Sequence, residues 1–364
     1  MTIKCIHTGD LHLGMEFKNA SFDIDYGKKR RIELWQTFDR IVNRAINNKV
    51  DFLFIAGDLF EDDYCSLGDI KRIAGKFAEA KNVNIVIATG NHDILTDKSF
   101  YRLVKWPENV YIFNNSVEKI EFEKFNTVIW GLSWDKKEEK RNLVDNIKAQ
   151  EQGKINVLLA HGDTFNKDSQ YLPINKDLLI NSGFDYVALG HIHKPQFITE
   201  RIAYCGSPEP LDFGETGLHG IIEGIVSKEK VDMQFVPFSK RMFITKEVQI
   251  DSEMTYQDII NKIIQCDDED SRSNNIYRII LKGIRDRDIA LDINELKESI
   301  KNNFNYVEII DKTEPDYDLD KIKKENKDNI IGYFIKEMEQ KNLKDPVVKD
   351  ALYYGLEALL KEKV

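Results

Sequence analysis

Apolar and polar residues alternate with two distinct periods along the first two hundred positions. Short apolar runs rich in β-branched residues, each followed closely by glycine, predict buried strands that end in tight turns: Ile3 to Thr8, Phe52 to Ala56, Asn84 to Thr89, Val157 to Leu159 and Tyr186 to Leu189. Apolar residues recur at helical spacing from Arg31 to Asn47 and from Leu67 to Ala80. This succession of strands and helices predicts an α/β fold with a mixed sheet and helices outside it.

Shorter apolar runs further along the chain predict a second sheet packed on the first. They span Val110 to Phe113, Val117 to Phe122, Thr127 to Gly131, Ile221 to Val226 and Met233 to Val236. We therefore expect residues 1–240 to form a two-sheet sandwich flanked by helices.

Residues 241–313 have the pattern of a separate small α/β domain. Strand patterns at Phe243 to Ile250, Ile276 to Leu281 and Tyr306 to Ile310 alternate with helical patterns at Thr255 to Ile264 and Ile293 to Asn302. The acidic tract Asp267 to Asp270 is expected to be a solvated loop.

A charged linker, residues 314–329, is expected to lead to two amphipathic helices in residues 330–364. Asp345-Pro346 suits the N-cap and first turn of the second helix. The apolar stripes of these helices include Phe334, Met338, Leu352 and Leu356. Such stripes either fold back on their own domain or dock a partner helix, and the pattern does not decide between the two.

The composition indicates a soluble, cytoplasmic protein. No apolar run approaches the length of a membrane-spanning helix, and no signal-peptide pattern follows Met1, so no membrane association is expected. The four cysteines, Cys5, Cys65, Cys205 and Cys266, are scattered and are expected to be reduced thiols. A net charge of −10 argues against wide, non-specific wrapping of nucleic acid.

Five short motifs place metal-binding side chains directly after predicted strands. In chain order they supply Asp10 and His12, Asp58, Asn91, His161, and His191 and His193. Carboxylate, amide and imidazole donors with open positions suit a two-metal site, in which a shared carboxylate holds ions about 3.5–4 Å apart. Asp58, alone at the second strand end, is the natural bridge. The motifs together predict a two-metal phosphoesterase.

The remaining histidines have different expected roles. His92 precedes Asp93, and a neighbouring carboxylate can orient an imidazole and raise its pKa. That environment suits a group that donates a proton to a departing alkoxide. His7 is expected to pack inside the first strand, and His219 to be exposed in a loop.

In these motifs the chain resembles the calcineurin-like metallophosphoesterase superfamily, and no ligand is missing. The resemblance implies that one metal is held by Asp10, His12 and His193 and the other by Asn91, His161 and His191. It also implies that His92 and Asp93 are catalytic and that His92 is not a metal ligand.

Two further segments resemble the SbcD/YhaO-type DNA repair exonucleases within that superfamily. They are Ala56-Gly57-Asp58-Leu59-Phe60-Glu61 and the turn from Cys205 to Glu215, which reads Cys-Gly-Ser-Pro-Glu-Pro-Leu-Asp-Phe-Gly-Glu. In those nucleases a small α/β capping domain follows the catalytic domain, as residues 241–313 do here. The resemblance extends over nearly the whole chain.

This resemblance implies a 3′ to 5′ exonuclease on duplex DNA that also cuts single strands internally. Its expected cofactors are two divalent ions, with Mn²⁺ the first choice. Its expected partners are DNA and an SMC-like coiled-coil ATPase of the SbcC/YhaN type, docked by the C-terminal helices; homodimer formation stays open. The alternatives are a phosphodiesterase for small nucleotides and a catalytically silent, metal-holding scaffold.

Two basic clusters are candidates for DNA contacts. Lys28, Lys29, Arg30 and Arg31 lie at the start of a predicted helix, where a solvated helix start is an equally good explanation. Arg278, Lys282, Arg285 and Arg287 surround one strand and loop of the small α/β domain. That domain is acidic overall, so a uniformly basic clamp is not expected.

Overall fold

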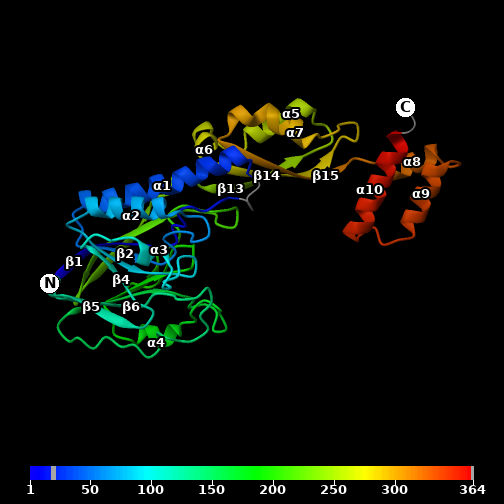
Figure 1. Cartoon of the computed structure of the whole chain (residues 1–364). Helices are drawn as coiled ribbons and strands as arrows, with labels where there is room; N and C mark the ends of the chain where they lie inside the picture. Colours follow the sequence, from blue (N-terminus) through cyan, green and yellow to red (C-terminus); the bar gives the residue numbers. More distant parts are fainter. Residues whose placement is uncertain (18–21, 362–364) are drawn as a thin grey trace. The chain divides into compact units, whose positions relative to one another are not determined.

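The computed structural model describes residues 1–17 and 22–361, and their contacts divide the chain into two units, Met1–Phe243 and the residues from Ile244 onwards (Figure 1). The first unit contains two six-stranded sheets. The first sheet has the order β12 (Val231–Pro237), β11 (Gly220–Ser227), β1 (Thr2–Thr8), β2 (Phe52–Ala56), β3 (Asn84–Ala88), β4 (Val110–Ile112). The second has the order β5 (Glu118–Phe122), β6 (Thr127–Gly131), β7 (Ile155–His161), β8 (Tyr186–Gly190), β10 (Ile202–Tyr204), β9 (Gln196–Thr199).

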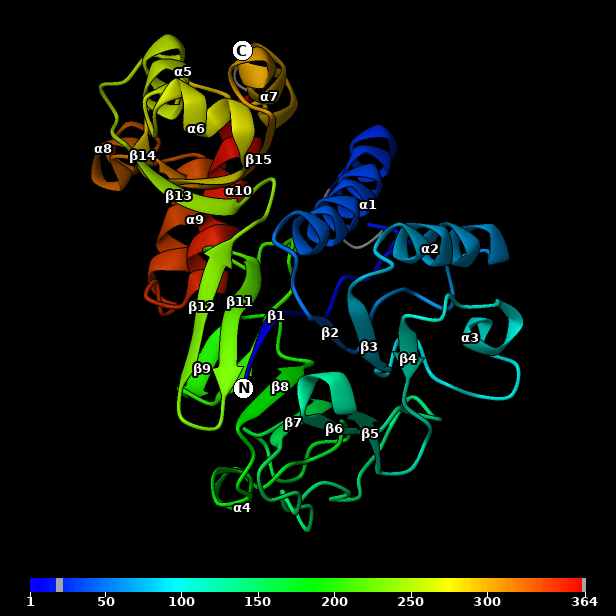
Figure 2. The ribbon, with the colours of Figure 1, turned by 90° about the vertical axis from the view of Figure 1, so that its left-hand side faces the viewer.

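The two sheets stack as layers with helices on their outer faces (Figure 2). Helices α1 (Ile24–Asn47) and α2 (Leu67–Glu79) cover the first sheet, the short α3 (Phe100–Leu103) follows β3, and α4 (Lys176–Ile180) follows β7. A 3₁₀ turn, Glu123–Phe125, joins β5 to β6. The predicted two-sheet sandwich flanked by helices is confirmed.

Strand β2 shows why its sequence reads as one continuous apolar run. Phe52, Phe54 and Ala56 belong to the core between the sheets, whereas Leu53 and Ile55 belong to the core beneath α1 and α2. Successive side chains of a strand point to opposite faces, so a strand buried on both faces must be apolar throughout. His7 of β1 is fully buried, as predicted.

The sequence assigned three strands to the wrong sheet. Strands β4, β11 and β12 extend the first sheet, because β4 pairs with β3 and β11 pairs with β1. Residue alternation identifies a strand but does not encode its pairing partner, which explains the error.

The second unit begins with a small three-stranded domain. Its sheet has the order β13 (Phe243–Ile250), β14 (Ile276–Arg285), β15 (Tyr306–Pro315), with β14 and β15 parallel. Helices α5 (Tyr256–Ile264), α6 (Glu269–Asn274) and α7 (Ile293–Ile300), and the 3₁₀ turn Lys301–Asn303, complete it. The predicted order of strands and helices is confirmed. The acidic tract is not a loop, however: Asp268 caps α6 by accepting a hydrogen bond from the Ser271 N–H.

Three helices end the described chain: α8 (Leu319–Glu325), α9 (Ile330–Glu339) and α10 (Pro346–Lys361). The predicted linker 314–329 contains the end of β15 and helix α8. Helix α8 belongs to the helical bundle, because its Ile322 is buried against α9 and α10. Asp345 accepts a hydrogen bond from the Val347 N–H at 3.0 Å, as its predicted capping role requires.

The predicted partner-docking residues form the core of these helices. Met338 and Leu352 are 8% and 2% exposed, Leu356 is fully buried, and Phe334 packs against the same cluster. The helices pack these four side chains against one another, so a partner contact through them stays a prediction that the packing does not favour.

The four cysteines are free thiols, and three of them are buried. In the described part of the chain, no helix is long and apolar enough to cross a membrane.

Candidate metal centre

The predicted ligands follow the carboxyl ends of five strands from both sheets. Asp10 and His12 follow β1, Asp58 follows β2, and Asn91 follows β3; His161 ends β7, and His191 and His193 follow β8. Strands β1, β2 and β3 are mutually parallel, as are β7 and β8. Parallel strands end at the same edge of a sheet, so the two sheets bring their ligands to one region.

Asp10, His12 and His193 form the first group of ligands. One ligand atom from each lies within 4.8 Å of the others. The two Nε2 atoms of His12 and His193 are 3.1 Å apart, and Asp10 Oδ1 lies 4.0 Å from His193 Nε2. This is the set that the resemblance assigns to one metal.

Asp58 connects this group to a second one. Its Oδ2 lies 3.3 Å from His161 Nε2 and 3.8 Å from His12 Nε2, so a single oxygen faces ligands of both groups. Asn91 Oδ1 lies 3.0 Å from His161 Nε2. Asp58 therefore faces both groups, as its predicted bridging role requires.

His191 is placed differently from the other candidates. Its ring centre lies 5.2 Å from that of His161, and its backbone N–H donates to Asp10 Oδ1 at 3.0 Å. Among the described residues, its ring nitrogens belong to none of the compact groups of metal-binding side chains. The structure places its ring beside the second group, and its backbone N–H contacts Asp10 of the first.

The donor set fits a pair of divalent cations. Each of three imidazoles has its Nδ1 within hydrogen-bonding distance of an acceptor: His12 of Glu61 at 2.7 Å, His193 of Glu215 at 2.5 Å, and His161 of the Ala56 carbonyl at 2.9 Å. Such acceptors fix the tautomer in which Nε2 carries the lone pair. An inward lone pair on each of these three rings, beside the buried carboxylates Asp10 and Asp58, suits a bound cation.

Four of the predicted ligands have a left-handed backbone. The φ angles are 49° at Asp10, 47° at His12, 50° at Asp58 and 98° at His191. Three other non-glycine residues of the described chain have a positive φ, so this strain is concentrated at the site. Hydrogen bonds from the Asp10 N–H to Gly57 O and from the His12 N–H to Asp58 O, both 3.0 Å, hold it.

Residues 3–195, which include all seven predicted ligands, match the calcineurin-like phosphoesterase family. The chain belongs to this family. Membership makes it a metal-dependent hydrolase, in agreement with the overlapping groups of metal-binding side chains Asp10, His12 and His193, and Asp10, Asp58 and His161.

Two curated relatives are similar to this phosphoesterase over part of their length. The uncharacterized metallophosphoesterase YhaO of Bacillus subtilis is 27% identical over 242 residues, which are 63% of this chain and 59% of YhaO. The DNA double-strand break repair protein Mre11 of Methanopyrus kandleri is 26% identical over 234 residues, which are 58% of this chain and 50% of Mre11. The match thus spans between half and six tenths of these relatives. Among solved structures, TT1561 of Thermus thermophilus matches 64% of this chain and 98% of its own, with a TM-score of 0.39 and 8% identity.

His92 lies beside the ligand cluster of this phosphoesterase with its side chain 42% exposed. Its ring centre is 4.8 Å from that of His12, and its Nδ1 lies 2.9 Å from Glu61 Oε2. The other oxygen of Glu61 bonds His12, so one carboxylate orients a ligand histidine and His92 together.

The carboxylate that orients His92 was predicted to be Asp93, and the structure corrects this. Asp93 is fully buried and accepts hydrogen bonds from the backbone N–H groups of Asp58, Leu59 and Gly90 and from the Tyr101 hydroxyl. Asp93 therefore holds the turn that carries Asp58, and Glu61 takes the role assigned to it.

The pair formed by Glu61 and His92 has opposite pKa shifts. Burial raises the pKa of Glu61, but the hydrogen bonds and charges of His12 and His92 outweigh it and lower the pKa to about 2. Burial lowers the pKa of His92, but the hydrogen bond to Glu61 and the charges of Asp58 and Glu61 give a net rise. The pair thus favours a carboxylate beside an imidazole that holds its proton.

Sequence reasoning missed both carboxylates that support the ligand histidines. Glu61 lies three residues after Asp58, in a segment already recognised as characteristic, and that proximity was an available signal. Glu215 lies 22 residues after His193, and no local pattern pairs the two. His219, expected to be exposed, is 2% exposed and lies 2.9 Å from Ser207 Oγ through its Nδ1.

The basic run at the start of α1 is only partly available to a polyanion. Arg30 is fully buried and forms ion pairs with Glu33 at 2.6 Å and with Glu209 at 3.2 Å, so the prediction of a DNA contact there is wrong. Lys28 is exposed and lies 3.1 Å from Asp25, and Arg31 donates to the Tyr64 carbonyl. Lys28, Lys29 and Arg31 retain some exposed surface.

The second basic cluster is largely neutralised within its own domain. Arg278 pairs with Glu308 at 2.7 Å, and Lys282 pairs with Glu247 at 2.5 Å. Arg285 donates to the Ile289 carbonyl, and Arg287 lies 3.8 Å from Asp288. These pairings weaken the expectation that this face binds phosphates.

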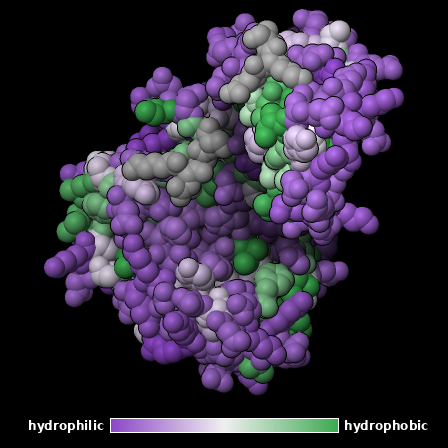
Figure 3. Space-filling model, turned by 90° about the vertical axis from the view of Figure 1, so that its right-hand side faces the viewer, coloured by the Kyte–Doolittle hydropathy of each residue, from purple (hydrophilic) through white to green (hydrophobic). Residues whose placement is uncertain are grey.

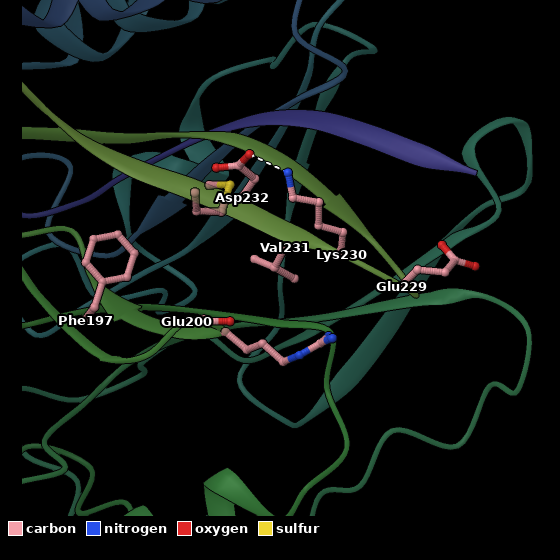
Figure 4. Close-up of a pocket in the computed structure, with 8 residues that line it drawn as sticks. Phe197, Glu200, Glu229, Lys230, Val231 and Asp232 are labelled. Carbon is pink, nitrogen blue, oxygen red and sulfur yellow. Dashed lines mark hydrogen bonds and ion pairs between the residues drawn. The ribbon is translucent and has the colours of Figure 1, made fainter.

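A cavity of about 630 Å³ lies between the edges of the two sheets, where β9 faces β12 (Figure 4). Its lining mixes Phe197, Val231 and Met233 with charges of both signs, including an ion pair between Lys230 and Asp232. None of the predicted ligands lines it, so it is separate from the metal centre.

Proposed function

We propose that this phosphoesterase is a DNA repair nuclease that digests duplex DNA from 3′ to 5′ and cuts single strands internally. The observation that carries the proposal is His92, a half-exposed imidazole held by Glu61 beside the ligand cluster. A proton donor at that position is needed when the leaving group is a poorly acidic alcohol, such as a deoxyribose hydroxyl. The choice of DNA is supported by the similarity to Mre11, a DNA double-strand break repair protein.

The chain's own residues would hold the cofactor and move one proton. Asp10, His12 and His193 would hold one divalent ion, and Asn91 and His161 the other, with Asp58 between them and His191 alongside. Manganese is the proposed metal. When bound, two such ions neutralise phosphate charge and lower the pKa of water.

In the reaction, a water molecule attacks phosphorus in line with the leaving oxygen and loses a proton to solvent, and the P–O bond to that oxygen breaks. His92 then gives its proton to the departing oxygen. Glu61 stabilises the protonated imidazole beforehand and keeps the ring in place.

The acidic surface supports an alternative substrate class, soluble phosphodiesters such as small nucleotides. The net charge is −10, and the predicted DNA-contacting residues Arg278 and Lys282 are paired with glutamates. A short substrate would need only the metal centre, whereas a duplex needs further contacts with its backbone.

We also propose that the C-terminal helices dock an SMC-like coiled-coil ATPase, through a face other than the one predicted. Val347, Ala351, Tyr354 and Ala358 follow helical spacing on α10 and are all exposed, Val347 and Tyr354 to 75%. Figure 3 shows hydrophobic side chains over part of the C-terminal helices. An apolar stripe of this kind suits a partner helix laid alongside it, and a second copy of this chain is the alternative occupant.

The experiment that tests the proposed function compares substrates directly. End-labelled duplex DNA, single-stranded circular DNA, cyclic nucleotides and bis-p-nitrophenyl phosphate are each incubated with the full chain and Mn²⁺. We expect stepwise shortening of the duplex and cleavage of the circle. Hydrolysis of cyclic nucleotides with no DNA product would instead establish the small-nucleotide alternative.

A further inference from the structure

The turn from Cys205 to Glu215 lies directly against the predicted ligand His193. Its sequence resembles that of the SbcD/YhaO-type nucleases, but the proposed function gives it no role. The Ser207 N–H donates to the His193 carbonyl at 2.9 Å. Gly206 makes this approach feasible, because its φ is +74° and a Cβ there would lie 2.7 Å from that same carbonyl oxygen. The backbone of the turn therefore fixes the backbone of the ligand loop.

The side chains of the turn extend this contact into a directed chain of hydrogen bonds. The Nδ1–H of His193 donates to Glu215 Oε1 at 2.5 Å. Glu215 Oε2 accepts from the Ser207 hydroxyl at 3.1 Å and from the Leu211 N–H at 3.0 Å. Because Ser207 gives its proton to Glu215, its hydroxyl oxygen can accept from His219 Nδ1 at 2.9 Å, and the Ser207 carbonyl oxygen is an equally near acceptor of the same N–H.

This chain is enclosed by the protein. Ser207 is fully buried, His219 is 2% exposed, and the Glu215 side chain is 18% exposed. A carboxylate whose two oxygens are both hydrogen-bonded has little freedom to move, so Glu215 holds its imidazole partner in one orientation.

A second buried contact anchors the same turn on helix α1. Glu209, 1% exposed, accepts hydrogen bonds from Arg30 at 3.2 Å, from the Thr37 hydroxyl at 2.6 Å and from the Lys240 N–H at 2.6 Å. The turn is thus fixed at Glu209 on one side and at His219 on the other.

We propose that Glu215, held by Ser207 and His219, is a positioning residue that fixes the tautomer and orientation of His193 as a metal ligand. It leaves the Nε2 lone pair directed at the site and raises the basicity of the ring, as outer carboxylates of metal-bound histidines do. The inference rests on the two-metal centre of the proposed function and is independent of DNA as the substrate.

Cobalt binding to the full chain tests this assignment, because Co²⁺ reports coordination through its visible absorption without any turnover. The metal-free wild type, Glu215→Ala and the control Glu200→Ala are each titrated with Co²⁺. We expect two equivalents in the wild type and the control. In Glu215→Ala, one equivalent should bind as before and the other about 10–100-fold more weakly, since loss of an outer-shell partner has that effect.

Two equivalents bound with unchanged affinity and spectrum in a folded Glu215→Ala variant would overturn the assignment. If that variant does not fold, Glu215→Gln and Ser207→Ala decide, since each keeps the shape of the turn. Weakening of one equivalent in both supports the assignment, and unchanged binding in both overturns it. If the wild type binds fewer than two equivalents of Co²⁺, the two-metal centre itself is contradicted. That result differs from a failure of the Glu215 assignment, in which the wild type still binds two equivalents.

Discussion

The side chain of Glu61 connects two histidines with different tasks. One oxygen bonds His12, a candidate metal ligand, and the other bonds His92, the proposed proton donor. The two imidazoles therefore have a common support, and displacement of Glu61 would disturb both. His92 lies outside the groups that contain Asp10 and Asp58, but it shares a further group of metal-binding side chains with His12 and Glu61, so its removal tests whether proton donation is separable from metal binding.

We expect His92→Ala to keep its bound metal and to lose about 10²–10⁴-fold in turnover on DNA, because general-acid assistance is typically of that size. The loss should be much smaller on bis-p-nitrophenyl phosphate, since p-nitrophenolate leaves without protonation. Turnover of the two substrates by wild type and variant measures the difference. Equal losses on both would show that His92 positions the phosphate and donates no proton.

His7 supplies a pH-dependent contribution to stability away from the ligands. Its Nδ1 lies 2.9 Å from the Tyr186 hydroxyl and its Nε2 3.2 Å from the Leu189 carbonyl, which suits the neutral ring. Burial lowers the pKa of His7 from 6.5 to about 3. Between these two pH values the unfolded chain binds a proton at His7 that the folded chain does not. The contribution of His7 to the free energy of unfolding is therefore fully present above pH 6.5 and decreases as the pH falls toward 3.

His7→Gln removes this titration while keeping a donor and an acceptor. Its stability relative to the wild type should therefore rise by up to about 1.4 kcal/mol for each pH unit below 6.5. Urea unfolding of both proteins between pH 7.5 and pH 5 measures this change as the difference between their free energies of unfolding. A constant difference across that range would contradict the buried, neutral state of His7.

At the scale of elements, helix α1 is an anchor as well as a covering layer. Arg30 reaches Glu209 in the turn that supports His193, and Glu33 of the same helix pairs with Arg241 at 2.7 Å. The basic run that suggested DNA binding thus contains one residue with a structural task. A charge pattern in sequence cannot separate the two uses, because it does not report which side of the helix is buried.

Arg30→Met should destabilise the first unit by about 3–5 kcal/mol, because it removes one charged partner from each of the buried carboxylates Glu33 and Glu209. The matched control Lys28→Met, whose side chain is 69% exposed, should change stability by no more than about 0.5 kcal/mol. Denaturant unfolding distinguishes the two. Similar small effects for both would contradict the buried ion-pair network.

The two faces of α10 should respond differently to a charge. Tyr354→Asp lies on the exposed stripe, so it should leave the thermal stability unchanged and abolish co-purification with the SMC-like ATPase. Leu352→Asp lies in the helical core, where a buried unpaired charge is costly, and should unfold the three helices. If Tyr354→Asp still binds the ATPase, the docking face is refuted. If the variant still binds the ATPase but no longer self-associates, the stripe is a homodimer contact.

At the scale of the whole molecule, local patterns predicted most strands, helices and ligand positions. They succeeded because a strand buried on both faces, such as β2, must be apolar, and because each predicted ligand either ends such a strand or lies in the segment just after it. They failed where the result depends on contacts distant in sequence. The sheet that β11 joins, the burial of Arg30 and the pairing of Glu215 with His193 are all fixed by segments far along the chain.

Asp58 is proposed to hold two metal ions between the two ligand groups. Asp58→Asn removes one negative charge facing both sites while preserving the side-chain shape, so both sites should weaken. Elemental analysis after dialysis against Mn²⁺, with hydrolysis of bis-p-nitrophenyl phosphate measured alongside, tests this most directly. The account predicts two manganese ions per wild-type chain, and fewer than two with no hydrolysis in the folded variant. Two ions and full activity in Asp58→Asn would contradict it.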